Sequence, residues 1–129
     1  MTHLLSLQVL VSEFAVVRLP PDAGLPWWAA GSKELLSHTR SLEETSIVCE
    51  ANRVPTDAQA ERGFRALRVE GAIPFQATGV LASLATPLAA ADVTVFVIST
   101  FDTDYVLVPG TLLNTAVQAL RGVGHSVRE

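Results

Sequence analysis

The chain has 129 residues, of which 49% are hydrophobic and 17% are charged, and its formal net charge at pH 7 is −4. This composition is apolar enough for a packed core and excludes general disorder, and the length suits one ordinary domain or two very small ones. The nine basic residues form no stripe, which argues against a nucleic-acid partner. A single cysteine, Cys49, excludes an internal disulfide and favours a reducing compartment.

The N-terminal stretch predicts two strands, residues 4–11 and 14–19, with a short turn between them. Its apolar run is interrupted by Ser6 and Gln8, and it has no basic region in front of it. These features are typical of strands rather than of a signal peptide or a membrane span. We therefore expect a cytoplasmic protein with no membrane partner.

A second hairpin is predicted later in the first half. Residues 20–31 are rich in Pro and Gly and contain Trp27 and Trp28, which we expect to cover a core face or a subunit contact. Residues 34–41 and 45–51 then predict two strands that flank an acidic turn.

The second half has more regular patterns. Six elements are predicted there, in the order strand, helix, strand, strand, helix, strand: residues 64–70, 78–90, 93–100, 105–108, 111–121 and 125–128. The third of them is nearly all apolar, which predicts a strand buried on both faces. The βαββαβ order is that of an α+β, ferredoxin-like fold.

Two residues of the first predicted helix have specific roles. Thr78 is predicted to be its N-cap. Pro87 lies inside the helix and has no N–H to donate to the carbonyl of Ser83, so that carbonyl is free to accept another hydrogen bond.

Three stretches carry a resemblance to a known family: GFRALRVEG, FQATGVLASLATPLAAADV and FVISTFDTDYVLVP, in this order. Together they resemble the ACT-domain family of small-molecule sensors. More closely, they are similar to two-ACT-domain amino-acid-binding proteins related to Castor-type arginine sensors and to aspartate kinase regulatory domains. The resemblance implies a ferredoxin-like sandwich in which residues 63–129 are a regular C-terminal ACT domain. Residues 1–62 would be a degenerate, ACT-like N-terminal module, because both halves contain a hairpin with an acidic turn.

The resemblance also implies a function. Such proteins are non-catalytic regulatory modules that hold a free amino acid at an interface between two ACT domains. It therefore implies an amino-acid ligand, a homodimer and a separate, unidentified regulated protein, with no cofactor, no metal and no enzyme activity. Carried over residue by residue, it implies these ligand-binding positions: Gly79, Val80, Ser83, Leu84, Thr100, Phe101 and Asp104.

The identity of the amino acid does not follow from the resemblance. Where the arginine sensors carry a glutamate in the turn before the helix, this chain has Gln76 and Ala77. Arginine is therefore not specified as the ligand.

Elementary chemistry gives several of these residues a consistent role. Backbone N–H groups at a helix start suit the carboxylate of an amino acid, and Gly79 allows it a close approach. Asp104 can accept from its ammonium group, and Phe101 can cover an aliphatic stem or a cation. The carbonyl of Ser83, left free by Pro87, is a further acceptor.

Two other interpretations of the acidic hairpin remain open. Asp102 and Asp104 can be turn formers, in which case the chain is a protein-interaction module without a ligand. They can also be an acid/base pair or two metal ligands in a small carboxylate-dependent enzyme, because side chains two apart on a strand point to the same face.

The remaining reactive side chains favour no further chemistry. His3, His38 and His125 are far apart and lack partners at metal-ligand spacing. Cys49 lies in an apolar strand, which predicts an inert, buried thiol.

Overall fold

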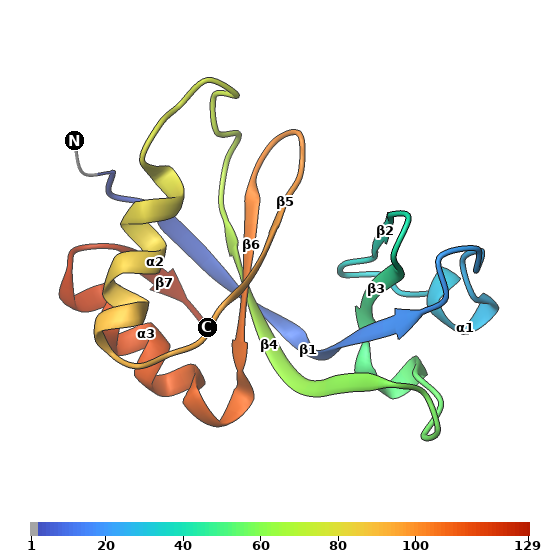
Figure 1. Ribbon diagram of the computed structural model, residues 1–129. Coiled ribbons are helices and arrows are strands. Elements are labelled where there is room, and N and C mark those ends of the chain that lie inside the picture. The colour runs from blue at the N-terminus through green and yellow to red at the C-terminus, as the bar shows by residue number, and fades with distance from the viewer. Residues whose placement is uncertain (1–2) are drawn as a thin grey trace. The chain divides into compact units, whose positions relative to one another are not determined.

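The computed structural model describes residues 3–129, which form two compact units. We call them the hairpin unit, Ser12–Phe64, and the two-helix unit, which combines residues 3–11 with Arg65–Glu129. The two longest strands, β1 (Ser6–Leu19) and β4 (Ala60–Val69), each contribute residues to both units (Figure 1).

The predicted order of elements in the second half is confirmed. After β4 the two-helix unit contains α2 (Val80–Ala90), β5 (Phe96–Ser99), β6 (Asp104–Pro109), a 3₁₀ turn (Gly110–Leu112), α3 (Leu113–Gly122) and β7 (Ser126–Arg128). The strands of this unit follow the order β7-β1-β4-β6-β5. Strand β1 runs parallel to β7, and β5 and β6 form an antiparallel hairpin.

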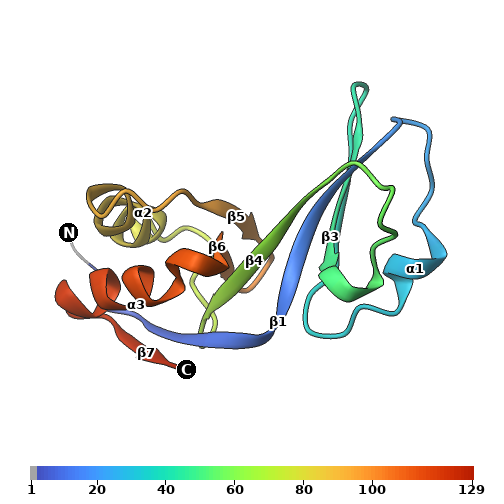
Figure 2. The same ribbon diagram turned by 90° about the horizontal axis from the view of Figure 1, so that it is seen from below.

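Helices α2 and α3 pack against each other and lie side by side in both views (Figures 1 and 2). Their inner residues are spaced three or four apart, so they share one face of each helix. These are Leu84 and Leu88 in α2 and Ala116, Val117 and Leu120 in α3, all fully buried. They form one hydrophobic core with strand residues such as Leu7, Leu67 and Val106. Within residues 3–129, neither helix nor any other is long and apolar enough to cross a bilayer.

Two strand predictions were wrong. Residues 93–100 were expected to form a strand buried on both faces, but β5 is the edge strand, and Phe96 and Ser99 are exposed. An apolar run in the sequence does not distinguish a central strand from an apolar strand at the edge of a sheet. The strands predicted at 4–11 and 14–19 are one continuous strand, β1, because its two ends pair with different partners, β7 and β3.

The hairpin unit contains the second predicted hairpin. It is formed by β2 (Ser37–Arg40) and β3 (Thr45–Glu50), which pair antiparallel, and β3 also pairs with β1. A short helix, α1 (Trp27–Ala30), and a 3₁₀ turn, η1 (Ala51–Arg53), complete the unit.

The two tryptophans of α1 have different surroundings. Trp28 packs against the hydrophobic core of the hairpin unit, as predicted for a residue that covers a core face. Trp27 is 86% exposed.

Residues 3–11 cluster with the two-helix unit because Ser6–Gln8 pair with β7. The compact units therefore do not follow a linear division of the chain at residue 62. That division into a degenerate and a regular ACT module stays a prediction about how the sequence is organised.

Candidate functional site

The β5–β6 turn is held in place by several hydrogen bonds. The N–H of Thr100 donates to the carbonyl of Thr103 at 2.8 Å, and the Thr103 N–H donates to Thr100 Oγ1 at 3.2 Å. The Thr103 hydroxyl also donates to the carbonyl of Val69 at 2.7 Å. The N–H of Ile73 donates to the carbonyl of Asp102 at 2.7 Å. These bonds fix the turn to the end of β4 and to the segment that follows it.

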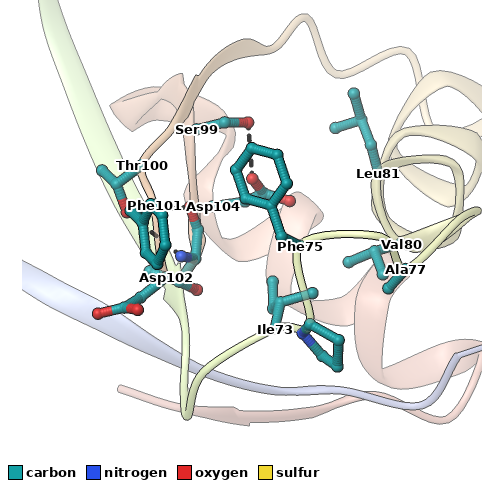
Figure 3. Close-up of a pocket in the computed structure, with 12 residues that line it drawn as sticks. Ile73, Phe75, Ala77, Val80, Leu81, Ser99, Thr100, Phe101, Asp102 and Asp104 are labelled. Carbon is teal, nitrogen blue, oxygen red and sulfur yellow. Dashed lines mark hydrogen bonds between the residues drawn. The ribbon is translucent and has the colours of Figure 1, made fainter.

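A pocket of about 270 Å³ lies between this turn, the segment after β4 and the start of α2 (Figure 3). Its volume is at the small end of the range for ligand pockets, which suits a small molecule. The pocket is lined by Ile73, Pro74, Phe75, Ala77, Val80, Leu81, Ser99, Thr100, Phe101, Asp102, Thr103 and Asp104.

Two aromatic rings stand at the open side of the pocket. The ring centroids of Phe75 and Phe101 are 5.6 Å apart, and the side chains are 75% and 83% exposed. Exposed rings at a pocket entrance can cover the apolar stem of a ligand or pack against a partner.

The two acidic residues of the hairpin have different positions. Asp104 is the first residue of β6, and its Oδ1 accepts a hydrogen bond from Ser99 Oγ at 2.6 Å. Asp102 lies in the turn before the strand, and its carboxylate points away from that of Asp104 (Figure 3). The two carboxylates therefore do not form the convergent pair that an acid/base or two-ligand site needs.

The start of α2 forms another side of the pocket. The N-cap is Gly79, whose φ of 80° lies in the left-handed region, and no side chain caps the helix. The prediction of Thr78 as N-cap was wrong, because the helix begins one residue later. The first N–H groups of a helix have no partner within it, and Val80 and Leu81 of this first turn line the pocket.

Of the seven ligand-binding positions that the resemblance implies, four line this pocket: Val80, Thr100, Phe101 and Asp104. Gly79 and Ser83 lie instead along a groove of about 540 Å³ beside α2. Leu84 is fully buried in the core, so it does not reach the pocket surface.

The carbonyl of Ser83 is not a free acceptor as predicted. It lies 2.8 Å from Nε2 of His125, and the Ser83 hydroxyl donates to the carbonyl of Gly79 at 2.9 Å. The side-chain hydroxyl and the backbone carbonyl of Ser83 are therefore both used by the protein itself.

Sequence reasoning missed the wall formed by Ile73, Pro74 and Phe75. This segment has neither helical nor strand periodicity, so no pattern marked it. Its one signal was an aromatic residue in an otherwise irregular, turn-rich stretch between a strand and a helix.

The charges of the pocket lining are one-sided. Among residues 3–129, the lining contains two carboxylates and no lysine or arginine. The lining therefore offers a ligand two carboxylates and the hydroxyls of Ser99, Thr100 and Thr103, but no cationic side chain.

Two other kinds of site were considered in residues 3–129: a reactive thiol and a metal centre. Cys49 is fully buried in β3, and burial raises its pKa to about 11, which keeps the thiol protonated and inert. Residues 3–129 contain no group of three or more histidine, cysteine, aspartate or glutamate side chains arranged to hold a metal ion.

Comparison with known families identifies the class of protein. The model of the ACT domain matches residues 59–122, and a second family model, which describes an N-terminal domain, matches residues 12–57. Residues 59–122 of this chain belong to the ACT-domain family.

Individual relatives place it more closely. The cytosolic arginine sensor for mTORC1 subunit 1 of Bos taurus is 37% identical over 101 residues, which cover 70% of this chain and 31% of the relative. The chain thus matches about a third of that protein's length.

Solved structures share the whole fold. A crystal structure of an Agrobacterium tumefaciens protein has a TM-score of 0.91 at 32% identity and covers 98% of this chain and 93% of its own. The regulatory subunit of aspartate kinase from Thermus thermophilus has a TM-score of 0.62 at 10% identity, with 90% and 97% covered, and shows likeness of fold alone.

Proposed function

We propose that this chain is a non-catalytic, amino-acid-binding regulatory protein that holds a free amino acid in the pocket between the β5–β6 turn and α2. Family membership supports a regulatory binding module, and the relatives include an arginine sensor and regulatory subunits of aspartate kinase. The regulated partner would be a separate protein, and the site of action the cytoplasm.

The observation that carries the proposal is the arrangement of opposite polar groups around one small pocket. Asp104 lies on one side, fixed by Ser99, and the uncapped first turn of α2 lies on the other. A free amino acid carries an ammonium and a carboxylate, and these groups match a carboxylate and a helix N-terminus. Phe75 and Phe101 would cover the side chain between them.

The proposal includes a homodimer in which two such pockets face each other. Helix α2 contains no charged residue, although one of its faces is open to solvent. That face consists of Leu81, Ala82, Thr86, Ala89 and Ala90. Strand β5 next to it is a sheet edge that exposes Phe96. An uncharged helix face beside a free sheet edge is typical of a surface that another chain covers.

The test is a thermal-shift and calorimetry series with each of the twenty amino acids. We expect at least one to raise the melting temperature, since a ligand at 100 times its Kd adds about 2.7 kcal/mol of stability. Asp104→Asn should weaken that binding about tenfold or more, because it removes the charged acceptor for the ammonium group. Asp102→Asn is the matched control, since it removes the other carboxylate of the lining, which points away from that of Asp104 (Figure 3), and it should bind as wild type does.

Two results would contradict the proposal. If no amino acid stabilises the protein, the chain is an interaction module without a ligand. If Asp104→Asn binds as tightly as Asp102→Asn, the ammonium is held elsewhere.

A further inference from the structure

His125 is a buried histidine that uses both of its ring nitrogens. Its side chain is 4% exposed and lies just before β7. The N–H of Leu5 donates to Nδ1 at 3.0 Å, and Nε2 lies 2.8 Å from the carbonyl of Ser83. One imidazole thus joins the N-terminal segment to the first turns of α2.

These two partners determine where the ring proton is. A backbone N–H can only donate, so Nδ1 of His125 must be the acceptor and carries no proton. A carbonyl can only accept, so Nε2 carries the proton. The arrangement requires a neutral imidazole in the Nε2–H form, because a protonated ring would place two donors, Nδ1–H and the Leu5 N–H, against each other.

The reason for this bond lies in the sequence of α2. Pro87 has no N–H, so the carbonyl of Ser83 lacks its partner within the helix. Buried or half-buried carbonyls without a partner are costly, and His125 supplies the missing donor. The proline and the histidine therefore act as a pair, 38 positions apart.

The N-terminal residues bind the same turn directly. The N–H of His3 donates to Ser83 Oγ at 3.3 Å, and Nε2 of His3 lies 2.7 Å from the carbonyl of Thr78. The carbonyl of Leu5 accepts from the N–H of Ser126 at 2.9 Å. We call residues 3–5 the strap, because they run from β7 to the start of α2.

We propose that neutral His125 is a positioning residue for the amino-acid site: it holds the strap and the first turn of α2 in the binding conformation, so that binding weakens under mild acid. This inference rests on the proposed function, since that turn is the proposed carboxylate site. Histidine is the side chain that ordinarily changes charge between about pH 5 and pH 8.

No charged side chain lines the groove beside His125, so we attribute the expected pH dependence of binding to its imidazole ring. The groove beside it is lined by Gly79, Ala82, Ser83, Thr86, Pro87, Ala90 and Val123, none of which is charged. The other titratable group on the turn is His3, which can donate from Nε2 in either charge state. On the α3 and β7 side, the charged groups are the ion pairs Arg121–Glu129 and Arg128–Glu70.

The first test uses the protein without a ligand. Nitrogen-15 NMR at about pH 7.5 should find His125 neutral with its proton on Nε2. Amide hydrogen exchange at residues 83–86, whose N–H groups lie beyond the unbonded start of α2, should quicken about three- to tenfold between about pH 7.5 and pH 5.5, after correction for the intrinsic pH effect. An Nδ1–H ring or a charged ring at the higher pH would overturn the assignment without any variant.

The decisive variant is His125→Gln, whose amide keeps one acceptor and one donor but does not titrate. Its exchange at residues 83–86 should be independent of pH over this range. His38→Gln, which changes an exposed histidine of β2, should retain the wild-type profile. If His125→Gln also retains that profile, His125 is not the positioning residue.

The second test uses an equimolar mixture of the twenty amino acids as the probe. The thermal shift that the mixture causes should be smaller at about pH 5.5 than at pH 7.5 in wild type, and equal at both in His125→Gln. No shift at either pH would contradict the proposed function, while the exchange experiment would still decide the role of His125. A shift that is equally pH-dependent in both proteins would overturn the inference.

Discussion

The hairpin unit and the two-helix unit differ in what binds a pair of neighbouring backbone N–H groups. In the hairpin unit the N–H groups of Lys33 and Glu34 both donate to Oε2 of Glu50, at 2.9 and 3.0 Å. In the two-helix unit no side chain caps the start of α2, which opens onto a pocket. The chain's own carboxylate satisfies the first pair of groups, whereas no side chain of this protein caps the start of α2. The comparison shows how a carboxylate of this chain binds paired backbone N–H groups, which is the role proposed for the ligand's carboxylate at the start of α2.

Both carboxylate oxygens of Glu50 accept hydrogen bonds from within the hairpin unit. Its side chain is 13% exposed, and its Oε1 accepts from Nε of Arg53 at 3.2 Å. The hydrogen bond from the Glu34 N–H is the main reason that the pKa of Glu50 lies below its usual value, and burial opposes it. Arg53 in turn packs on Gly31, where a side chain would collide with the guanidinium.

The largest expected effect comes from the two hydrophobic cores. It tests whether each unit depends on its own core for stability. Leu84→Ala in the two-helix unit and Ile47→Ala in the hairpin unit each remove a fully buried side chain. Each should lower the free energy of unfolding by about 2–5 kcal/mol in urea titrations. Exposed Leu42→Ala is the control and should change it by less than about 0.5 kcal/mol. A small loss for either core variant would contradict the packing described for that unit.

The next effect tests how much the hydrogen bonds to Glu50 stabilise the hairpin unit. Glu50→Gln should lower stability at neutral pH by about 1.5–3 kcal/mol, because hydrogen bonds to a charged acceptor are lost. Since the folded-state pKa is lowered, this contribution is present above the unfolded pKa and disappears as the pH falls through the folded value. Urea titrations at several pH values should therefore show wild type and variant converging in acid.

Glu43→Gln provides the control for Glu50, because Glu43 is exposed in the β2–β3 turn. It should leave both the stability and its pH dependence unchanged. A constant difference between wild type and Glu50→Gln down to strong acid would show that the charge of Glu50 is not responsible.

A third prediction compares two glycines in the left-handed region, one in each unit. Gly79 (φ 80°) caps α2, and Gly63 (φ 81°) lies within β4. An alanine at either position should cost about 1 kcal/mol through backbone strain. Only Gly79→Ala should also weaken amino-acid binding, because it displaces the turn that faces the pocket. Equal loss of binding in both variants would contradict the assignment of the pocket to the two-helix unit.

The smallest effects concern surface ion pairs. Glu44 pairs with Arg18 in the hairpin unit, and both side chains are nearly half exposed, so Glu44→Gln should cost about 0–0.5 kcal/mol. Glu70 is less exposed and contacts Arg128 through both carboxylate oxygens in the two-helix unit. Glu70→Gln should therefore cost more, up to about 1 kcal/mol. Thermal unfolding at low and high salt would measure both, and a larger loss for Glu44→Gln would reverse the order.

Much of the candidate site could be predicted because it lies in the regular second half. The βαββαβ order followed from periodicity. Val80, Thr100, Phe101 and Asp104, which the family resemblance implied, line one pocket, and their role in binding stays a prediction. The different orientations of Asp102 and Asp104 could not be read from their spacing, since Asp102 lies in a turn rather than on the strand.

The sequence by itself determined the elements of this protein, because side-chain periodicity and turn residues are local properties. It also identified Pro87 as a residue that leaves the Ser83 carbonyl without a partner. Only the tertiary structure decided that His125 supplies the donor, that Leu84 belongs to the core and that β5 is an edge. Those outcomes depend on which segments meet in space, and contacts between distant residues leave no mark in the local pattern of a single chain.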